Sequence, residues 1–119
     1  MKQIFFIYRD SVVTELTKSI LDSHGVSTYA LNDITEDFSY IVNDLEPELV
    51  LIDEALYEGN EELIMASLKN CTVAQSKWVF LSEDTQKAHP FHLSFQLPLK
   101  AKSIFEDLKE LVDSELVQN

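Results

Sequence analysis

Apolar residues fall into short continuous runs separated by longer stretches of helical spacing. The runs are too short for helices, and most are followed by charged or turn residues; they cover residues 3–8, 26–31, 49–52, 78–81 and 93–97. Between most of these runs, apolar residues recur three or four positions apart, which is typical of a helix with one buried face. The pattern therefore predicts five strands that alternate with helical segments.

Residues that favour helix ends flank several of the helical stretches. Asp10 or Ser11 is a suitable N-cap for the first helix, before a glycine stop at His24-Gly25. Asp33 and Glu36 form a capping-box pattern before the second helix. Further predicted features are a cap at Asn60, the end of the second helix at Pro47, and a last amphipathic helix after Pro98.

Alternating strands and helices favour a parallel sheet, because right-handed crossovers place helices on both faces. The run Leu49–Ile52 is apolar throughout and stops at Asp53, as expected of a central strand covered on both faces. Only residues 83–92, with Pro90 among them, remain for the fourth crossover, whereas about a dozen are usual. We expect one α/β domain over residues 1–119, a doubly wound five-stranded parallel sheet whose fourth helix is shortened or irregular.

Acidic residues outnumber basic ones by 21 to nine, which gives a net charge of -12. Such a surface repels phosphate backbones and argues against direct nucleic-acid binding. No apolar run approaches the roughly 20 residues that span a bilayer, and the first residues do not form a signal peptide. A lone Cys71 fits a reducing compartment, so we expect a cytoplasmic protein without membrane contact.

The segment Glu46-Pro47-Glu48-Leu49-Val50-Leu51-Ile52-Asp53 resembles the strand of bacterial response-regulator receiver domains that ends in the phosphoacceptor aspartate. Asp53 takes that position. Ser82, after the Trp78–Leu81 run, is similar to the receiver serine or threonine that hydrogen-bonds the phosphoryl group. The resemblance covers nearly the whole chain and implies a CheY-like fold with strand order 2-1-3-4-5. Sites in such sheets form beyond the carboxyl ends of the strands, where the order reverses.

Three positions depart from the receiver pattern. The family's two adjacent magnesium-binding acids correspond by position to Tyr8 and Arg9, and its lysine-proline pair corresponds to Leu97-Pro98. Both acids and the lysine are therefore replaced. Magnesium prefers carboxylate and water oxygens, and phosphoryl transfer needs positive charge to neutralise the incoming group. We expect no cofactor, and Mg²⁺ binding that is lost or weak.

Nearby polar residues do not restore the missing groups. Asp10 and Glu54 each lie one position away from a family counterpart, so their side chains are expected to point elsewhere. Arg9 either pairs with Asp53, as a charge-assisted substitute for the metal, or extends into water. The sequence leaves both alternatives open. The histidines have no metal-site spacing, and the chain has no glycine-rich phosphate loop, so neither a metal centre nor nucleotide hydrolysis is expected.

These observations favour a pseudo-receiver, a non-enzymatic module that binds proteins without being phosphorylated. Two alternatives remain: a working receiver that uses Asp53 in a two-component phosphorelay, and the regulatory N-terminal domain of a larger transcription activator. We expect protein partners to bind the region 83–99 and the last helix. There, Phe91 and Phe95 either form an exposed apolar patch or fold inward to fill the space of the missing helix.

Overall fold

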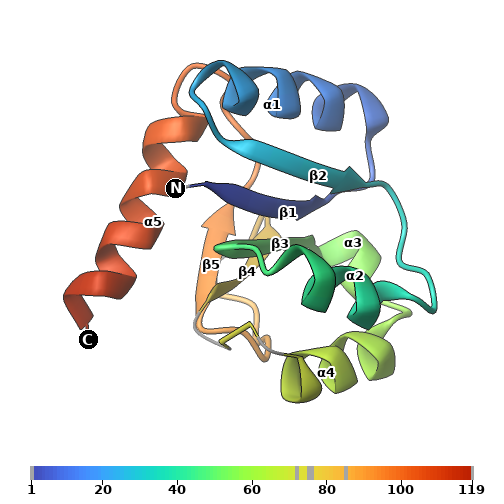
Figure 1. The fold of residues 1–119 in the computed structure, drawn as a ribbon. Helices are drawn as coiled ribbons and strands as arrows, with labels where there is room; N and C mark the ends of the chain where they lie inside the picture. Colours follow the sequence, from blue (N-terminus) through green and yellow to red (C-terminus); the bar gives the residue numbers. More distant parts are fainter. Residues whose placement is uncertain (1, 72, 75–76, 85, 119) are drawn as a thin grey trace.

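Five parallel strands form one sheet in the order β2-β1-β3-β4-β5 (Figure 1). The computed structural model describes residues 2–71, 73–74, 77–84 and 86–118. The strands are β1 (Gln3–Ile7), β2 (Ser27–Leu31), β3 (Leu49–Asp53), β4 (Trp78–Ser82) and β5 (Leu93–Gln96). Each neighbouring pair is parallel. The predicted doubly wound fold, with its strand order, is confirmed.

Helices cover both faces of this sheet. They are α1 (Ser11–Ser23), α2 (Phe38–Leu45), α3 (Glu54–Tyr57), α4 (Glu61–Asn70) and α5 (Ile104–Gln118). Figure 1 shows α1 and α5 on one side of the sheet and α2, α3 and α4 on the other. In the described part of the chain, no helix is long and apolar enough to cross a membrane.

Two apolar cores lie between the sheet and its helices. β3 contributes to both, because successive side chains of a strand point to opposite faces. Val50 and Ile52 belong to the core under α2 and α4, whereas Leu49 and Leu51 belong to the core under α1 and α5. All five residues of β3 are buried, as the continuous apolar run predicts. The last of them is Asp53, so the central strand carries a carboxylate into the interior.

The fourth crossover contains no helix in its described residues, which confirms the expected irregular segment. Its Phe91 is buried and packs against Tyr57, Trp78 and Phe80, with ring centroids 5.7, 6.1 and 5.8 Å away. One phenylalanine therefore folds inward and fills part of the space left by the helix. Phe95 differs, because it is half-buried and packs against the core on the opposite face.

The helix ends follow the sequence signals in part. Asp10 caps α1, and its Oδ1 accepts hydrogen bonds from the backbone N–H groups of Val12 and Val13 at 2.9 and 3.2 Å. The predicted capping box before α2 is wrong, because Asp33 Oδ1 accepts a hydrogen bond from the backbone N–H of Ile34 at 2.8 Å. Helix α2 begins only after Asp37, where the buried Phe38 fixes its first turn against the core.

One further expectation about helix ends is corrected, and one agrees with the structure. Asn60 precedes α4, but its side chain does not cap that helix; its Nδ2 donates to the carbonyl of Leu56 at 2.8 Å. It thereby ties α4 to the short helix α3, which the apolar pattern does not predict. Helix α2 ends at Leu45, and the cap residue Glu46, directly before Pro47, adopts a left-handed conformation with φ 47°, which agrees with the expected end.

Candidate functional site

The candidate site lies at the carboxyl ends of β1, β3 and β4. Ile7 pairs with Ile52 in the parallel register, so the residues that follow β1 lie beside Asp53 at the end of β3. Ser82 ends β4 on the other side of β3. The structure thus gathers Arg9, Asp53 and Ser82 at the edge of the sheet where the strand order reverses, as doubly wound folds require of a binding site.

Asp53 is held by four hydrogen bonds, three of them from Arg9. Its Oδ2 accepts from the backbone N–H of Arg9 at 3.0 Å and from Nε at 2.9 Å. Its Oδ1 accepts from Nη2 of Arg9 at 3.0 Å and from the backbone N–H of Ala55 at 3.1 Å. The Asp53 side chain is fully buried, whereas that of Arg9 is 48% exposed. Of the two alternatives for Arg9, the internal pair is the one present.

The geometry explains why arginine suits this position. A planar guanidinium can meet both carboxylate oxygens at once, which lysine cannot do. The hydrogen bond to Asp53 raises the pKa of Arg9 above its already high ordinary value. A buried carboxylate without such a partner would carry a large desolvation cost. Arg9 therefore satisfies the buried Asp53 carboxylate while about half of its own side chain stays exposed.

A second polar network lies next to this pair. Ser82 Oγ donates to Oε2 of Glu54 at 2.7 Å, and Lys87 Nζ donates to Oε1 of Glu54 at 2.7 Å. The same ammonium group donates to Glu58 at 2.6 Å, while the backbone N–H of Asp84 donates to Ser82 Oγ at 3.0 Å. The bonds from Lys87 and Ser82 lower the pKa of Glu54, and the two glutamates raise the pKa of Lys87.

This network corrects the expectation that Glu54 points away from the site, and it adds a residue that sequence reasoning missed. Glu54 does not bind Asp53, but its carboxylate engages the Ser82 hydroxyl. Lys87 is the only lysine or arginine in residues 83–92. A single cation in this segment is the feature of the sequence that could have drawn attention to Lys87. Its two glutamate partners could not be predicted, because an apolar pattern does not determine the path of an irregular segment.

The remaining predicted residues lie around the site without joining the ion pair. The Tyr8 ring stacks on the Phe6 ring, with centroids 5.7 Å apart. The guanidinium carbon of Arg9 lies 5.7 Å from the centroid of the Tyr8 ring. Burial is the main cause that raises the pKa of Tyr8. Asp10 is engaged in capping α1, which agrees with the expectation that it cannot replace a lost ligand.

Leu97 and Pro98 follow the edge strand on the far side of β4. Leu97 is buried in the core under α1 and α5, and its backbone N–H donates to the carbonyl of Ser82 at 2.9 Å. The peptide bond between Leu97 and Pro98 is cis. An apolar side chain thus stands where the receiver pattern has a lysine.

A cavity of about 340 Å³ opens over the site and is predominantly acidic. It is lined by Arg9, Glu54, Ala55, Glu58, Glu83 and Asp84. A magnesium ion does not fit at Asp53, because both carboxylate oxygens already accept from Arg9 and a fixed guanidinium charge stands beside them. Among the described residues, no three His, Cys, Asp or Glu side chains are grouped to hold a metal ion.

Comparison with known proteins places this geometry in a structural context. No family profile and no curated protein sequence matches the chain. Among solved structures, a CheY-like receiver domain protein from Methanospirillum hungatei JF-1 superposes with a TM-score of 0.72 at 18% identity, over 100% of this chain and 99% of that one. The fold is that of a CheY-like receiver domain.

Further receiver structures agree with this result. A response regulator from Thermotoga maritima gives a TM-score of 0.69 at 13% identity, covering 95% of this chain and 98% of that one. A CheY-like receiver domain from Methylobacillus flagellatus gives 0.68 at 16% identity, covering 93% and 98%. At these identities the likeness establishes the receiver fold alone, so the function of this chain must be argued from its own site.

Proposed function

We propose that this chain is a receiver-like signalling domain that acts as a phosphorylation-independent protein-interaction module. The observation that carries the proposal is the buried Asp53 carboxylate, with both oxygens bonded to the single arginine of the chain. The fold is that of a domain built around an aspartate at this place. In this chain, the Arg9 side chain already donates hydrogen bonds to both carboxylate oxygens of that aspartate.

The chemistry of phosphoryl transfer argues against a reaction at Asp53. A carboxylate oxygen must be free to attack phosphorus in line, and the negative charge of the transferred group must be neutralised. Here the attacking oxygens are held by Arg9, and the mouth of the site carries Glu54, Glu58, Glu83 and Asp84. An incoming dianion would have to displace Arg9 and approach these carboxylates.

The second network supports the same proposal. In the receiver pattern a serine or threonine hydroxyl binds the phosphoryl group, but the hydroxyl of Ser82 already donates to Glu54. Lys87 adds a cation to the same carboxylate. Glu54, Ser82 and Lys87 together form a charged cluster that needs no external anion. We infer that the site has one resting arrangement, fixed by the amino-acid sequence.

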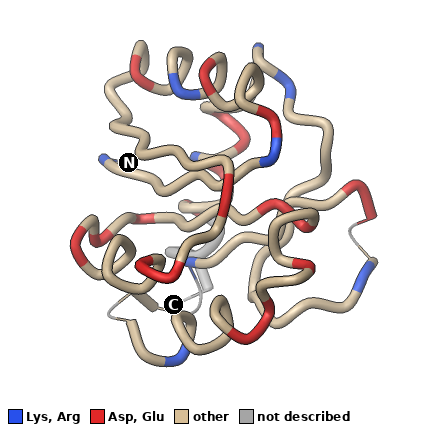
Figure 2. Tube along the Cα trace, turned by 90° about the vertical axis from the view of Figure 1, so that its right-hand side faces the viewer, with Lys and Arg blue, Asp and Glu red and all other residues tan. Residues whose placement is uncertain are grey.

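A protein is the partner class that the surface favours. Figure 2 shows Asp and Glu residues spread over several helices and loops, and the net charge is -12. This charge repels nucleic acids. A non-enzymatic, cytoplasmic binding module therefore remains the proposal, and a working phosphoacceptor, suggested by the presence of Asp53 and Ser82, is the alternative that the experiment must exclude.

The test exposes the protein to Mg²⁺ and beryllofluoride, a phosphoryl mimic, and follows backbone amide shifts together with Trp78 fluorescence. We expect no saturable change at Arg9, Asp53 or Ser82. A receiver domain with the usual acid pair and lysine, treated in parallel, verifies the reagent. Saturable shifts centred on Asp53 in the wild-type chain would show a working receiver and overturn the proposal.

A further inference from the structure

Side chains, rather than regular backbone structure, hold the chain between β4 and β5 in place. Residues 86–92, all of which the structure describes, form neither a helix nor a strand, and we call them the β4–β5 strap. The backbone N–H of Lys87 donates to the carbonyl of Asp84 at 3.2 Å, which closes a turn within the same stretch of chain. A segment fixed in this way opens locally at a lower free-energy cost than the sheet beside it.

His89 is the central contact of the strap. Its ring stacks on Phe80 of β4, with centroids 4.7 Å apart and an angle of 17° between the ring planes. Its Nδ1 accepts a hydrogen bond from the backbone N–H of Phe91 at 3.2 Å. Only an unprotonated ring nitrogen can accept such a bond, so this geometry requires neutral His89. His89 thereby orients Phe91, whose ring is buried in the core.

Protonation of His89 removes this contact. An imidazolium carries N–H groups on both nitrogens, so its Nδ1–H faces the N–H of Phe91 and two donors oppose each other. The added charge also lies near the Phe80 and Phe91 rings, with centroids 4.7 and 5.9 Å away, and burial lowers the pKa of His89. In an open strap the ring is in water, where it binds a proton at its ordinary pKa. Acid therefore favours the open strap.

The charged groups on the neighbouring elements are mainly paired with one another. The titratable groups there are Glu54, Tyr57 and Glu58 on α3 and at its end, and Glu83, Asp84, Lys87 and His92 between β4 and β5. Lys87 binds both Glu54 and Glu58. Burial raises the pKa of Tyr57, so its phenol stays neutral where His89 titrates. Burial thus remains the main influence on the His89 proton.

The strap is connected to the polar network at the candidate site. Lys87, two residues before His89, donates to Glu54 at 2.7 Å and to Glu58 at 2.6 Å. Glu54 also accepts from the hydroxyl of Ser82 at 2.7 Å, and that hydroxyl accepts from the N–H of Asp84 at 3.0 Å. Withdrawal of Lys87 leaves two carboxylates without their cation in the lining of the acidic cavity.

We propose that the β4–β5 strap is an acid-sensitive latch, in which protonation of His89 releases residues 86–92 from Phe80 and withdraws Lys87 from Glu54 and Glu58. The step moves one proton from solvent to Nδ1 and is therefore reversible. The closed strap covers the core with Phe91, whereas the open strap uncovers it and leaves a more acidic site. The inference rests on the proposed function, because it gives that interaction module a signal other than phosphorylation.

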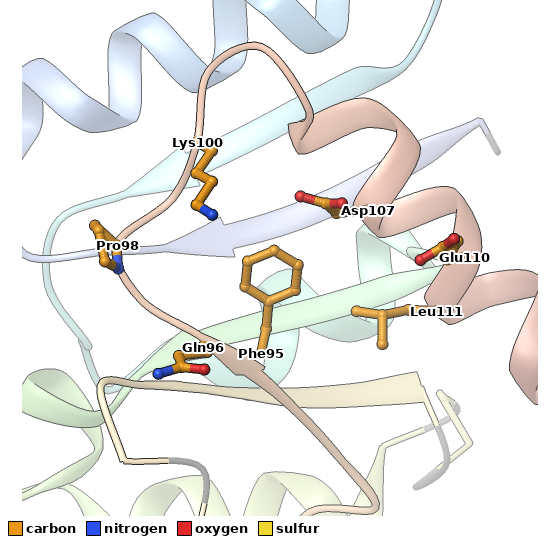
Figure 3. Close-up of a pocket in the computed structure, with 7 residues that line it drawn as sticks. All are labelled: Phe95, Gln96, Pro98, Lys100, Asp107, Glu110 and Leu111. Atoms are coloured by element: carbon orange, nitrogen blue, oxygen red, sulfur yellow. The ribbon is translucent and has the colours of Figure 1, made fainter.

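A cavity of about 450 Å³ between β5 and α5 lies outside this latch. In Figure 3 the ring of Phe95 stands between the loop that carries Lys100 and the helix that carries Leu111. None of its described lining residues belongs to the strap. Phe95 and Leu111 pack against the core on the opposite face of the sheet from Phe91. The amide of Leu111 is therefore an internal reference that opening of the strap should leave unchanged.

The test measures amide hydrogen exchange of the full chain between about pH 7.5 and about pH 5, corrected for the intrinsic pH dependence of exchange. Protection of the Lys87 and Phe91 amides reports on the strap, and protection of the Asp84 amide reports on the Ser82 network. Trp78 fluorescence gives a second readout, because the Trp78 ring stacks on Phe91 with centroids 6.1 Å apart.

Two variants assign the response to one histidine. His89→Phe keeps an aromatic ring beside Phe80 but cannot bind a proton. His92→Phe makes the same change at an exposed position of the strap and is the matched control. Circular dichroism verifies that both variants fold.

Below about pH 6.5, protection at Lys87, Phe91 and Asp84 should fall together by up to about tenfold per pH unit, as release coupled to one proton requires. Leu111 should keep its protection. His89→Phe should abolish the pH dependence, and His92→Phe should retain it.

Three results overturn the proposal. Loss of protection at Leu111 in parallel with the strap shows that the whole domain opens. Loss at Phe91 without loss at Asp84 shows that His89 is not coupled to the Ser82 network. Full pH dependence in His89→Phe assigns the response to another group.

The two proposals fail separately. A strap that does not respond to acid leaves the Arg9–Asp53 pair and its insensitivity to beryllofluoride intact, so only the acid control is wrong. A beryllofluoride response at Asp53, by contrast, refutes phosphorylation-independent function whatever the strap does.

Discussion

Arg9 and Asp53 are unequal partners, because one is half exposed and the other is fully buried. Without Arg9, the Asp53 carboxylate would remain in the interior with only the backbone donors of residues 9 and 55. Without the carboxylate charge, Arg9 would still contact water. The penalty for leaving a charge unpaired falls mainly on the buried member of such a pair. Substitutions at the two positions should therefore differ in their cost.

We predict that Arg9→Ala lowers the free energy of unfolding by about 1 to 3 kcal/mol, because it removes two charge-assisted hydrogen bonds from a buried carboxylate. Asp53→Asn should destabilise the chain by a different route, because no charge stays buried but the amide nitrogen then faces two of the N–H donors that the carboxylate oxygens now accept from. Urea denaturation at neutral pH measures both. Lys18→Ala is the control, because Lys18 pairs with Asp22 on the surface of α1 and should contribute less than about 0.5 kcal/mol. Equal losses for Arg9→Ala and Lys18→Ala would contradict the buried-pair interpretation.

At the scale of elements, the segment between β4 and β5 performs two roles that a helix would otherwise fill. Its Lys87 bridges Glu54 and Glu58 at the mouth of the site, and its Phe91 fills the core beside Trp78. Between them, His89 stacks on Phe80 with centroids 4.7 Å apart. An irregular segment is therefore fixed at three points by side chains rather than by a regular backbone ladder.

The packing of Phe91 predicts a large effect of its removal. Phe91→Ala should lower the free energy of unfolding by about 3 to 5 kcal/mol, as expected when a buried phenylalanine is truncated and leaves a cavity. Phe95→Ala is the matched control four residues later, and its effect should be clearly smaller because Phe95 is only half-buried. Chemical denaturation of both variants provides the comparison. A cost of Phe91→Ala no greater than that of Phe95→Ala would show that this segment does not complete the core.

His89 makes the same segment sensitive to acid. Burial lowers the pKa of His89 below its ordinary value of 6.5, and its Nδ1 accepts from the N–H of Phe91 at 3.2 Å. Around it, Tyr57 stays protonated in this range because burial raises its pKa. As the pH falls, the unfolded chain therefore binds a proton at this histidine before the folded chain does. The contribution of neutral His89 to the free energy of unfolding is fully present above about pH 6.5 and is lost as the pH falls toward the lower pKa of the folded state.

We therefore predict that the free energy of unfolding falls between about pH 7 and about pH 5, and that His89→Gln reduces this dependence. Equilibrium denaturation across the range measures it. His92→Gln serves as the control, because His92 is exposed in the same segment. An identical pH profile in the wild type and His89→Gln would rule out the assignment to His89.

The whole molecule shows which features a sequence pattern can predict. Continuous apolar runs fix the five strands, and the shared carboxyl edge of a parallel sheet brings Arg9 close to Asp53. The sequence does not determine whether Arg9 pairs with Asp53, because an exposed arginine can equally extend into water. Lys87 and α3 were not predicted, since their positions depend on the path of irregular chain rather than on periodicity. The resemblance to receivers supplied the strand order, which the apolar pattern alone does not determine.

The overall charge gives a prediction at this same scale. Because the net charge is -12 and acidic residues lie on several elements (Figure 2), the chain should not bind duplex DNA even at about 50 mM salt, where electrostatic attraction is strong. Fluorescence anisotropy with labelled DNA tests this. Binding that weakens steeply with added salt would indicate a basic contact surface that the sequence does not suggest.

The hydrogen bonds from Arg9 to Asp53 have a consequence for how information would be stored. They are made by atoms of the polypeptide itself, so they form when the chain folds and persist while it stays folded. Under the proposed function, no kinase writes this state and no phosphatase erases it. The domain then keeps no record of a past stimulus, and the strength of its output is set by how many copies the cell synthesises and degrades.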